Sequence, residues 1–210
     1  MLKRIIFDVD GTLIEKMDLK ILVKEELKKQ GISYTKKDLD AYMLAMKTYE
    51  DEYLSYDINN YLEYIKSNCG LDIDIKYMQN FLNSVSSYVP EAGASIALKN
   101  TLEYLKGKYE LVVLTNYFRI VQENRLRNFG ILSYFDEIYG GDTIIKPTTE
   151  AFRIAQGNNK RSECLMIGDS FSLDYLGAIS SGMDAILVDK TINKSTPEKI
   201  KSVKELKRIL

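Results

Sequence analysis

Short apolar runs that alternate with helical patterns constrain the fold of this chain more than any other feature. The first run, Ile5-Ile6-Phe7, is rich in β-branched and aromatic residues and stops at Asp8, as a buried strand does. Similar runs recur at residues 111–114, 137–139, 164–167 and 185–188. Helical patterns that end near a glycine lie between them, at residues 119–129, 150–155 and 173–180. This alternation predicts an α/β fold with a parallel sheet and right-handed crossovers.

One long stretch with only helical patterns interrupts the alternation. Between residues 15 and 89 the chain shows no convincing strand, and Asp18, Asp57 and Asp74 can each cap a helix. Thr35, with an aspartate three residues later, resembles a capping box. We therefore predict about four helices, inserted between the first strand and the rest of the sheet.

The insertion divides the chain into two predicted parts. The α/β part comprises residues 1–14 and 90–210, and the helical part comprises residues 15–89. A Pro-Glu-Ala-Gly turn that begins at Pro90 marks the return to the sheet. A length of 210 residues fits one medium domain with a smaller insertion.

Histidine is absent from the sequence, and its absence limits the chemistry that the chain can perform. It excludes Ser-His-Asp and Cys-His catalysis, and it excludes zinc sites built on histidine. Acid–base chemistry must therefore use carboxylates, lysine, tyrosine or a metal-bound water.

Composition also narrows the partners and the location. Lysine and arginine number 29 and aspartate and glutamate number 30, so the overall field does not attract a nucleic-acid polymer. No apolar run approaches the roughly 20 residues that span a bilayer, and the N-terminal run is too short for a signal peptide. Cys69 and Cys164 stand far apart and are expected to be free thiols. We expect a cytoplasmic protein without membrane or nucleic-acid partners. No sequence signal bears on its oligomeric state.

Polar residues gather where the predicted strands end. Ligands of open α/β sheets bind outside the carboxyl ends of the strands, so these residues are expected to lie together. They are Asp8, Asp10, Gly11 and Thr12 after the first strand, Thr115 and Asn116 after the second, Lys146 and Pro147 beyond the third, and Gly168, Asp169, Ser170 and Asp174 after the fourth.

The negative charges of this set would need a cation nearby. Two carboxylates 4 Å apart repel by roughly 4 kcal/mol at an effective dielectric constant of 20. Convergence of the four aspartates therefore requires a positive partner, and hard oxygen ligands favour Mg²⁺. Lys146 adds a fixed positive charge that can stabilise an anionic ligand. Thr115 offers a hydroxyl and Asn116 a backbone N–H to oxygen atoms of such a ligand.

The ordered set of four motifs resembles that of the haloacid dehalogenase superfamily. The matching segments are Asp8-Val-Asp-Gly-Thr, Thr115-Asn116, Lys146-Pro147 with Phe152 five residues beyond the proline, and Gly168-Asp169-Ser170 with Asp174. The resemblance implies a Rossmann-like parallel-sheet core flanked by helices. The helical insertion is similar to the cap of the family's C1 type.

The resemblance also implies a role for each site residue. Asp8 would be the nucleophile that attacks phosphorus, and Asp10 would protonate the leaving alcohol and then activate water. Asp8, the backbone carbonyl of Asp10, and Asp169 would hold Mg²⁺, with Asp174 as a direct or outer-shell supporting ligand. The residues that would bind the phosphoryl oxygens are Thr115, Asn116 and Lys146, and Thr115 and Lys146 are also assigned to the catalytic set.

The implied function is Mg²⁺-dependent hydrolysis of a small phosphorylated metabolite through an aspartyl-phosphate on Asp8. Asp10 favours phosphoryl transfer, because dehalogenases of the superfamily lack the second aspartate. A phosphomutase is one alternative, disfavoured because the sugar mutases typically use a cap histidine. A receiver-like signalling domain is another, disfavoured because Asp169 comes last in the chain and because the insertion is large.

Substrate choice is expected to depend on the helical insertion. In the resembling family the first loop of the cap often dips towards the active site, and here that loop would be near residues 31–34. Arg119 could contact an anionic substrate group, although an exposed helix start is the more ordinary interpretation. The tyrosine-rich faces of the insertion are expected to pack against one another, and the lysine-rich stretch 194–207 is expected to form a terminal helix.

Overall fold

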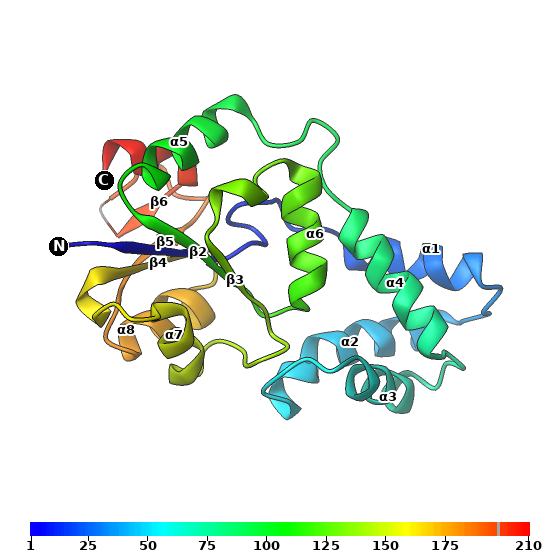
Figure 1. Cartoon of the computed structure of the whole chain (residues 1–210). Coiled ribbons are helices and arrows are strands. Elements are labelled where there is room, and N and C mark those ends of the chain that lie inside the picture. The colour runs from blue at the N-terminus through cyan, green and yellow to red at the C-terminus, as the bar shows by residue number, and fades with distance from the viewer. Residues whose placement is uncertain (197) are drawn as a thin grey trace.

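A six-stranded parallel sheet forms the centre of the molecule (Figure 1). The computed structural model describes residues 1–196 and 198–210. The strands are β1 (Arg4–Phe7), β2 (Glu110–Leu114), β3 (Glu137–Tyr139), β4 (Cys164–Gly168), β5 (Asp184–Val188) and β6 (Lys199–Ile200). Their order is β3-β2-β1-β4-β5-β6, so β1 lies between β2 and β4. The predicted fold class is confirmed, and Asp8 lies at the end of a central strand.

Helices cover both faces of the sheet because successive side chains of a strand point to opposite sides. Ile5 and Phe7 pack with α5 (Ile96–Lys106) and α6 (Arg119–Phe129). Ile6 packs on the other face, with α7 (Thr149–Gln156) and α8 (Gly177–Ser180). All four side chains between Arg4 and Phe7 are buried, as expected for a parallel strand covered on both faces.

The helical insertion lies to one side of the sheet (Figure 1). Its helices are α1 (Leu19–Lys29), α2 (Lys36–Glu52), α3 (Ile58–Cys69) and α4 (Ile75–Ser87). Asp18, Asp57 and Asp74 each accept backbone N–H hydrogen bonds as N-caps, and Thr35 forms a capping box with Asp38. The prediction of four inserted helices is confirmed. The division at residues 14/15 and 89/90 remains a prediction.

Tyrosines form much of the interior of the insertion, as predicted from their helical spacing. Tyr49 and Tyr61 are buried, and their rings meet edge to face with centroids 4.9 Å apart. The same apolar cluster includes Val85 of α4 and Phe118 and Val121 at the start of α6. This shared packing joins the insertion to the sheet-bearing part of the chain.

Two segments differ from the sequence prediction. The expected terminal helix over 194–207 is wrong: β6 and a 3₁₀ helix, Val203–Arg208, take its place, and Pro197 lies outside the described residues. Ile200, Val203 and Leu206 are nevertheless buried as expected, because their spacing serves either arrangement. The predicted helix at 173–180 is split into a π-helical turn, Phe171–Leu176, followed by α8.

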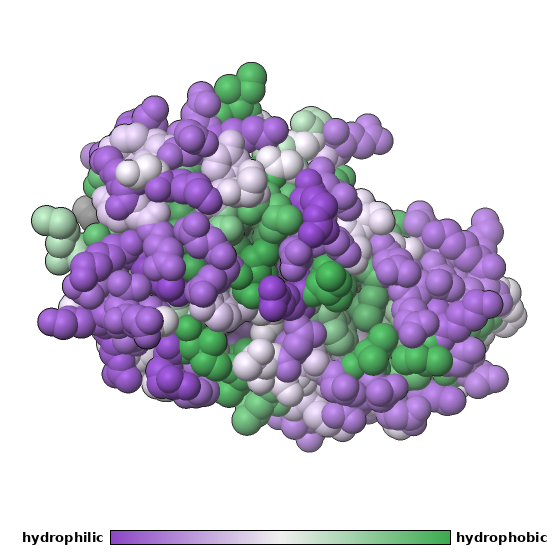
Figure 2. All heavy atoms as spheres, viewed as in Figure 1, coloured by the Kyte–Doolittle hydropathy of each residue, from purple (hydrophilic) through white to green (hydrophobic). Residues whose placement is uncertain are grey.

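The surface of the molecule is mixed in character. Figure 2 shows hydrophilic residues over most of one face, with hydrophobic residues visible in smaller patches between them. Among the described residues, no helix combines the length and the apolar character that crossing a membrane requires.

Candidate active site

A cavity of about 370 Å³ lies between the sheet and the helical insertion, at the carboxyl ends of β1, β2 and β4. The sheet side contributes the polar residues at the strand ends, and the insertion contributes Leu19, Glu50, Tyr56 and Val85. Every residue assigned to catalysis, phosphate binding or metal binding from sequence lines this one cavity. These residues are Asp8, Asp10, Thr115, Asn116, Lys146, Asp169 and Asp174.

Lys146 joins two of the aspartates. Its Nζ donates to Asp8 Oδ1 at 2.8 Å and to Asp174 Oδ1 at 2.5 Å. The other oxygen of Asp174 accepts the backbone N–H of Ser170 at 2.9 Å, so both oxygens of Asp174 are engaged. Among residues 1–196 and 198–210, the one side-chain donor to Oδ2 of Asp8 is the Thr12 hydroxyl, at a long 3.4 Å. One oxygen of Asp8 is therefore held by Lys146, and the other is bound weakly enough to contact a further ligand.

Burial and charge act against each other at Asp8. Burial raises the pKa of its carboxyl group, and the positive charge of Lys146 opposes that rise. The two carboxylates raise the pKa of Lys146 although its burial acts in the other direction, so the ammonium keeps its charge. A further cation near Asp8 would favour the ionised carboxylate, which is the form that attacks an electrophile.

Asp169 completes a cluster that could hold a metal ion. One oxygen each of Asp8, Asp169 and Asp174 lies within 4.8 Å of the other two. Such oxygen donors suit Mg²⁺. Asp169 also forms an ion pair with Lys16, whose Nζ lies 2.6 Å from Oδ2. Gly11, at φ 86°, leaves space here that a Cβ would take from Asp169.

Asp10 points away from this cluster towards α6. Its Oδ1 accepts from Arg125 Nη1 and its Oδ2 accepts from Gln122 Nε2, each at 2.7 Å. Gln122 Nε2 also donates to the Thr115 hydroxyl at 3.1 Å. The carboxylate of Asp10 is thus outside the three-aspartate cluster, and its sequence-based link to the metal rests on its backbone carbonyl.

Asn116 connects the sheet to the insertion. Its side-chain amide pairs with the backbone of Lys146 in both directions, through bonds of 2.7 and 2.8 Å. Its Nδ2 also donates to Glu50 at 2.9 Å, and Glu50 accepts the hydroxyl of Tyr56 at 2.9 Å. Burial raises the pKa of Glu50, while the bonds from Asn116 and Tyr56 act against that rise. An acidic side chain of the insertion therefore faces the cavity.

Sequence reasoning missed several residues that line the cavity. Gln122 and Arg125 stand three apart on a predicted helix, and that spacing would have placed them on one face. Lys16 follows the first motif closely, but its contact with Asp169 depends on the turn at Gly11. The sequence around Glu50 does not indicate a place in the site, because Glu50 reaches the cavity only through the packing of α2.

Two sequence-based suggestions about substrate choice are not supported by the geometry. Residues 31–34 line a separate surface groove with Lys24 and Lys28, and among the described residues they are not part of the cavity at Asp8. The end of α1 carries this loop away from the strand ends. Arg119 has a mostly exposed side chain that pairs with Glu123, as an ordinary helix start does.

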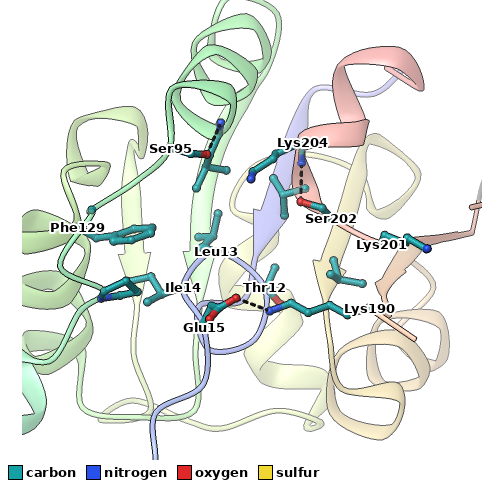
Figure 3. Close-up of a pocket in the computed structure, with 15 residues that line it drawn as sticks. Thr12, Leu13, Ile14, Glu15, Ser95, Phe129, Lys190, Lys201, Ser202 and Lys204 are labelled. Atoms are coloured by element: carbon teal, nitrogen blue, oxygen red, sulfur yellow. Dashed lines mark hydrogen bonds and ion pairs between the residues drawn. The ribbon is translucent and has the colours of Figure 1, made fainter. Parts of the chain in front are cut away.

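The loop after β1 also lines a second cavity, of about 390 Å³ (Figure 3). Several of its polar side chains already have local partners: Ser95 and Ser202 accept N–H hydrogen bonds as helix N-caps, and Lys190 pairs with Glu15. The acidic cluster lies in the other cavity. The cavity at Asp8 is therefore the candidate active site.

Comparison with known protein families agrees with this geometry. Residues 5–188 match the model of the haloacid dehalogenase-like hydrolases, which covers all four motifs and the insertion. This chain belongs to the haloacid dehalogenase-like hydrolases. The helical insertion between β1 and β2 is consistent with a C1 cap, and we refer to residues 15–89 as the cap from here on.

Curated relatives of this haloacid dehalogenase-like hydrolase include phosphatases. A pyrimidine 5'-nucleotidase of Escherichia coli is 29% identical over 113 residues, which are 51% of this chain and 49% of the relative. The chain thus matches about half the length of that relative. A glyceraldehyde 3-phosphate phosphatase of Methanothermobacter thermautotrophicus is 26% identical over 93% of this chain and 89% of the relative.

Solved structures of the family share the fold. A putative hydrolase of Bacillus subtilis, bound to magnesium, superposes with a TM-score of 0.71 at 20% identity, over 100% of this chain and 98% of that chain. An L-2-haloacid dehalogenase of Xanthobacter autotrophicus, with chloropropionic acid covalently bound, gives 0.71 at 13% identity over the same shares. Fold alone therefore does not distinguish a phosphatase from a dehalogenase. The distinction has to come from the side chains of the candidate active site.

Proposed function

We propose that this chain is a Mg²⁺-dependent phosphatase that hydrolyses a small phosphomonoester through an aspartyl-phosphate on Asp8. The observation that carries the proposal is the buried contact between Asp8 and Lys146 beside the carboxylates of Asp169 and Asp174. An ionised carboxylate next to a fixed ammonium can attack phosphorus, and the ammonium can neutralise charge on the phosphoryl oxygens.

The reaction would use two displacements at phosphorus. In the first, an oxygen of Asp8 forms a bond to phosphorus while the bond to the alcohol oxygen breaks, and Asp10 donates a proton to that oxygen. In the second, water attacks the same phosphorus, Asp10 takes a proton from the water, and the bond to Asp8 breaks. Inorganic phosphate leaves and Asp8 is restored.

The donor set fits a magnesium ion. Asp8, Asp169 and the backbone carbonyl of Asp10 would hold it, with Asp174 in support because both of its oxygens already accept hydrogen bonds. When bound, the ion supplies positive charge between the carboxylates and the phosphoryl group. The phosphoryl oxygens would also meet the Thr115 hydroxyl, the Asn116 backbone and Lys146.

Asp10 supports phosphatase over dehalogenase activity. Displacement of a halide needs no proton donor, whereas an alkoxide leaving group does. Two of the relatives carry nucleotidase and phosphatase names, and they suggest pyrimidine nucleoside monophosphates and triose phosphates as the first compounds to test. Glu50 and Tyr56 of the cap line the cavity, and the side-chain oxygens of both could accept hydrogen bonds from hydroxyl groups of such substrates.

Phosphate release tests the proposal directly. Purified protein would be assayed on a panel of nucleoside monophosphates, triose phosphates and sugar phosphates, with Mg²⁺ and with chelator. We expect Mg²⁺-dependent release from at least one compound, and loss of that release in Asp8→Asn. An Asp8→Asn variant that keeps full activity would contradict the mechanism, and interconversion of sugar phosphates without net release would favour a mutase.

A further inference from the structure

The carboxylate of Asp10 is fixed by two side chains that lie outside the recognised motifs. Gln122 and Arg125 project from one face of α6, and each donates to a different oxygen of Asp10 at 2.7 Å. Both donors are 1% exposed, so neither exchanges these bonds with bulk water. The orientation of Asp10 is therefore determined by α6.

Asp10 balances the buried positive charge of Arg125. A guanidinium stays protonated even when buried, so it needs an anionic partner. Its remaining acceptors are neutral, namely the Gln122 side-chain carbonyl at 2.8 Å and the Tyr88 backbone carbonyl at 3.3 Å. Among residues 1–196 and 198–210, Asp10 is the one carboxylate paired with Arg125, and Nη2 has no hydrogen-bond partner. Loss of Asp10 would leave a buried charge uncompensated.

Gln122 extends this arrangement to the phosphate side of the cavity. Its carbonyl accepts from Arg125, which fixes the amide with its Nε2 towards Asp10. The same Nε2 donates to the Thr115 hydroxyl. The Gln122 amide thus spans the gap between the carboxylate of Asp10 and a residue assigned to phosphate binding.

The guanidinium itself is anchored at the junction of cap and core. Tyr88, whose carbonyl accepts from Arg125 Nε, is the C-cap residue of α4, the last cap helix. Asn128, one turn further along α6, donates to the backbone carbonyl of Ser86 at 3.2 Å. The cap therefore anchors one side of the Arg125 guanidinium, and the other side of the guanidinium binds Asp10.

We propose that Gln122 and Arg125 are the positioning residues for Asp10. They set where its protonated carboxyl group stands when it donates to the leaving alcohol, and where the resulting carboxylate stands when it takes a proton from water. The inference rests on the proposed function, because it assigns the acid role to Asp10. Neither side chain transfers a proton itself. Their loss should therefore weaken the acid without removing the nucleophile Asp8.

Leaving-group dependence distinguishes this role from a general structural one. An aryl phosphate such as p-nitrophenyl phosphate releases a stable anion and needs little help from an acid, whereas an alkyl phosphate needs that help. The test measures kcat and KM for both substrates in Arg125→Met, Arg125→Lys and Gln122→Met. Arg127→Gln is the matched control, since Arg127 is an exposed arginine on the same helix that pairs with Glu123.

For Arg125→Met and Gln122→Met we expect kcat on the alkyl phosphate to fall by about 10²-fold, the low end of what a positioned acid contributes, with less than about a threefold fall on the aryl phosphate. KM should change little, and Arg125→Lys should recover part of the loss. The control should match wild type. If Arg125→Met does not fold, Gln122→Met and Arg125→Lys decide the question.

Equal losses on both substrates, or no loss on the alkyl phosphate, would overturn the positioning role while leaving the phosphatase assignment intact. A wild-type protein that releases phosphate from neither substrate class would overturn the proposed function first, and the positioning role with it.

Discussion

Nζ of Lys146 lies 2.8 Å from Oδ1 of Asp8, and both side chains are buried at the end of the central strand. The same ammonium lies 2.5 Å from Asp174, so one positive charge serves two carboxylates. Asp169 adds a third carboxylate nearby, which is paired with Lys16. The cluster therefore holds more negative charge in its interior than Lys146 alone can balance, which suits a divalent cation.

Replacing Lys146 by methionine should destabilise the fold. The change leaves Asp8 and Asp174 buried without their shared partner, and breaking a buried pair typically costs about 3–5 kcal/mol. Mg²⁺ should recover part of that loss, because it supplies the missing positive charge. Denaturant unfolding of Lys146→Met with and without Mg²⁺ measures both effects. Lys47→Met, at an exposed lysine of α2, is the control, and equal stability of the two variants would contradict the account.

Lys16→Met should bind Mg²⁺ more tightly than wild type. Lys16 pairs with Asp169, so a metal ion at the cluster has to displace its ammonium. The Lys16 side chain is 64% exposed, which limits the effect to about threefold in Kd. Calorimetric titration with Mg²⁺ measures the difference, with Lys190→Met as a control for loss of a nearby surface pair. Weaker or unchanged binding in Lys16→Met would show that the two cations do not compete.

Glu50 should make stability depend on pH. Burial raises the pKa of Glu50 in the folded chain above its ordinary value, so folding favours the protonated form. The associated stability is present below the unfolded-state pKa, about 4.5, and is lost as pH rises through the folded-state pKa. The melting temperature of Glu50→Gln minus that of wild type should therefore increase with pH across this window. Glu63→Gln, at an exposed position of α3, should show no such trend, and a flat difference for Glu50→Gln would contradict the assignment.

The parts of the site that follow from strand topology could be predicted from the sequence. Asp8, Thr115 and Asp169 directly follow apolar runs, and parallel strands bring their carboxyl ends to one edge whatever the details of packing. The N-caps at Asp18 and Asp57 are likewise local, since each satisfies N–H groups within the next three residues.

The parts that depend on packing between elements could not be predicted in this way. The contact of Arg125 with Asp10 depends on how α6 rotates against the sheet, and that rotation is set by the shared cluster of α6 and α4. The loop at residues 31–34 was suggested by the family resemblance as a region that selects substrate, but the direction of α1 carries it to another surface. Helix α5, whose N-cap is Ser95, was not predicted, because it follows the Pro-Glu-Ala-Gly turn without a strong sequence boundary.

Detection of a phosphorylated Asp8 tests the central claim most directly. Wild-type protein would be mixed with Mg²⁺ and its best phosphomonoester, quenched in acid within one turnover and reduced with borohydride, which converts an aspartyl-phosphate to homoserine. Peptide mass spectrometry would then locate the reduced residue. The account predicts homoserine at position 8, dependent on substrate, and unmodified Asp10, Asp169 and Asp174. Active protein with modification at another residue, or with none under conditions that trap an acyl phosphate, would contradict the nucleophilic role of Asp8.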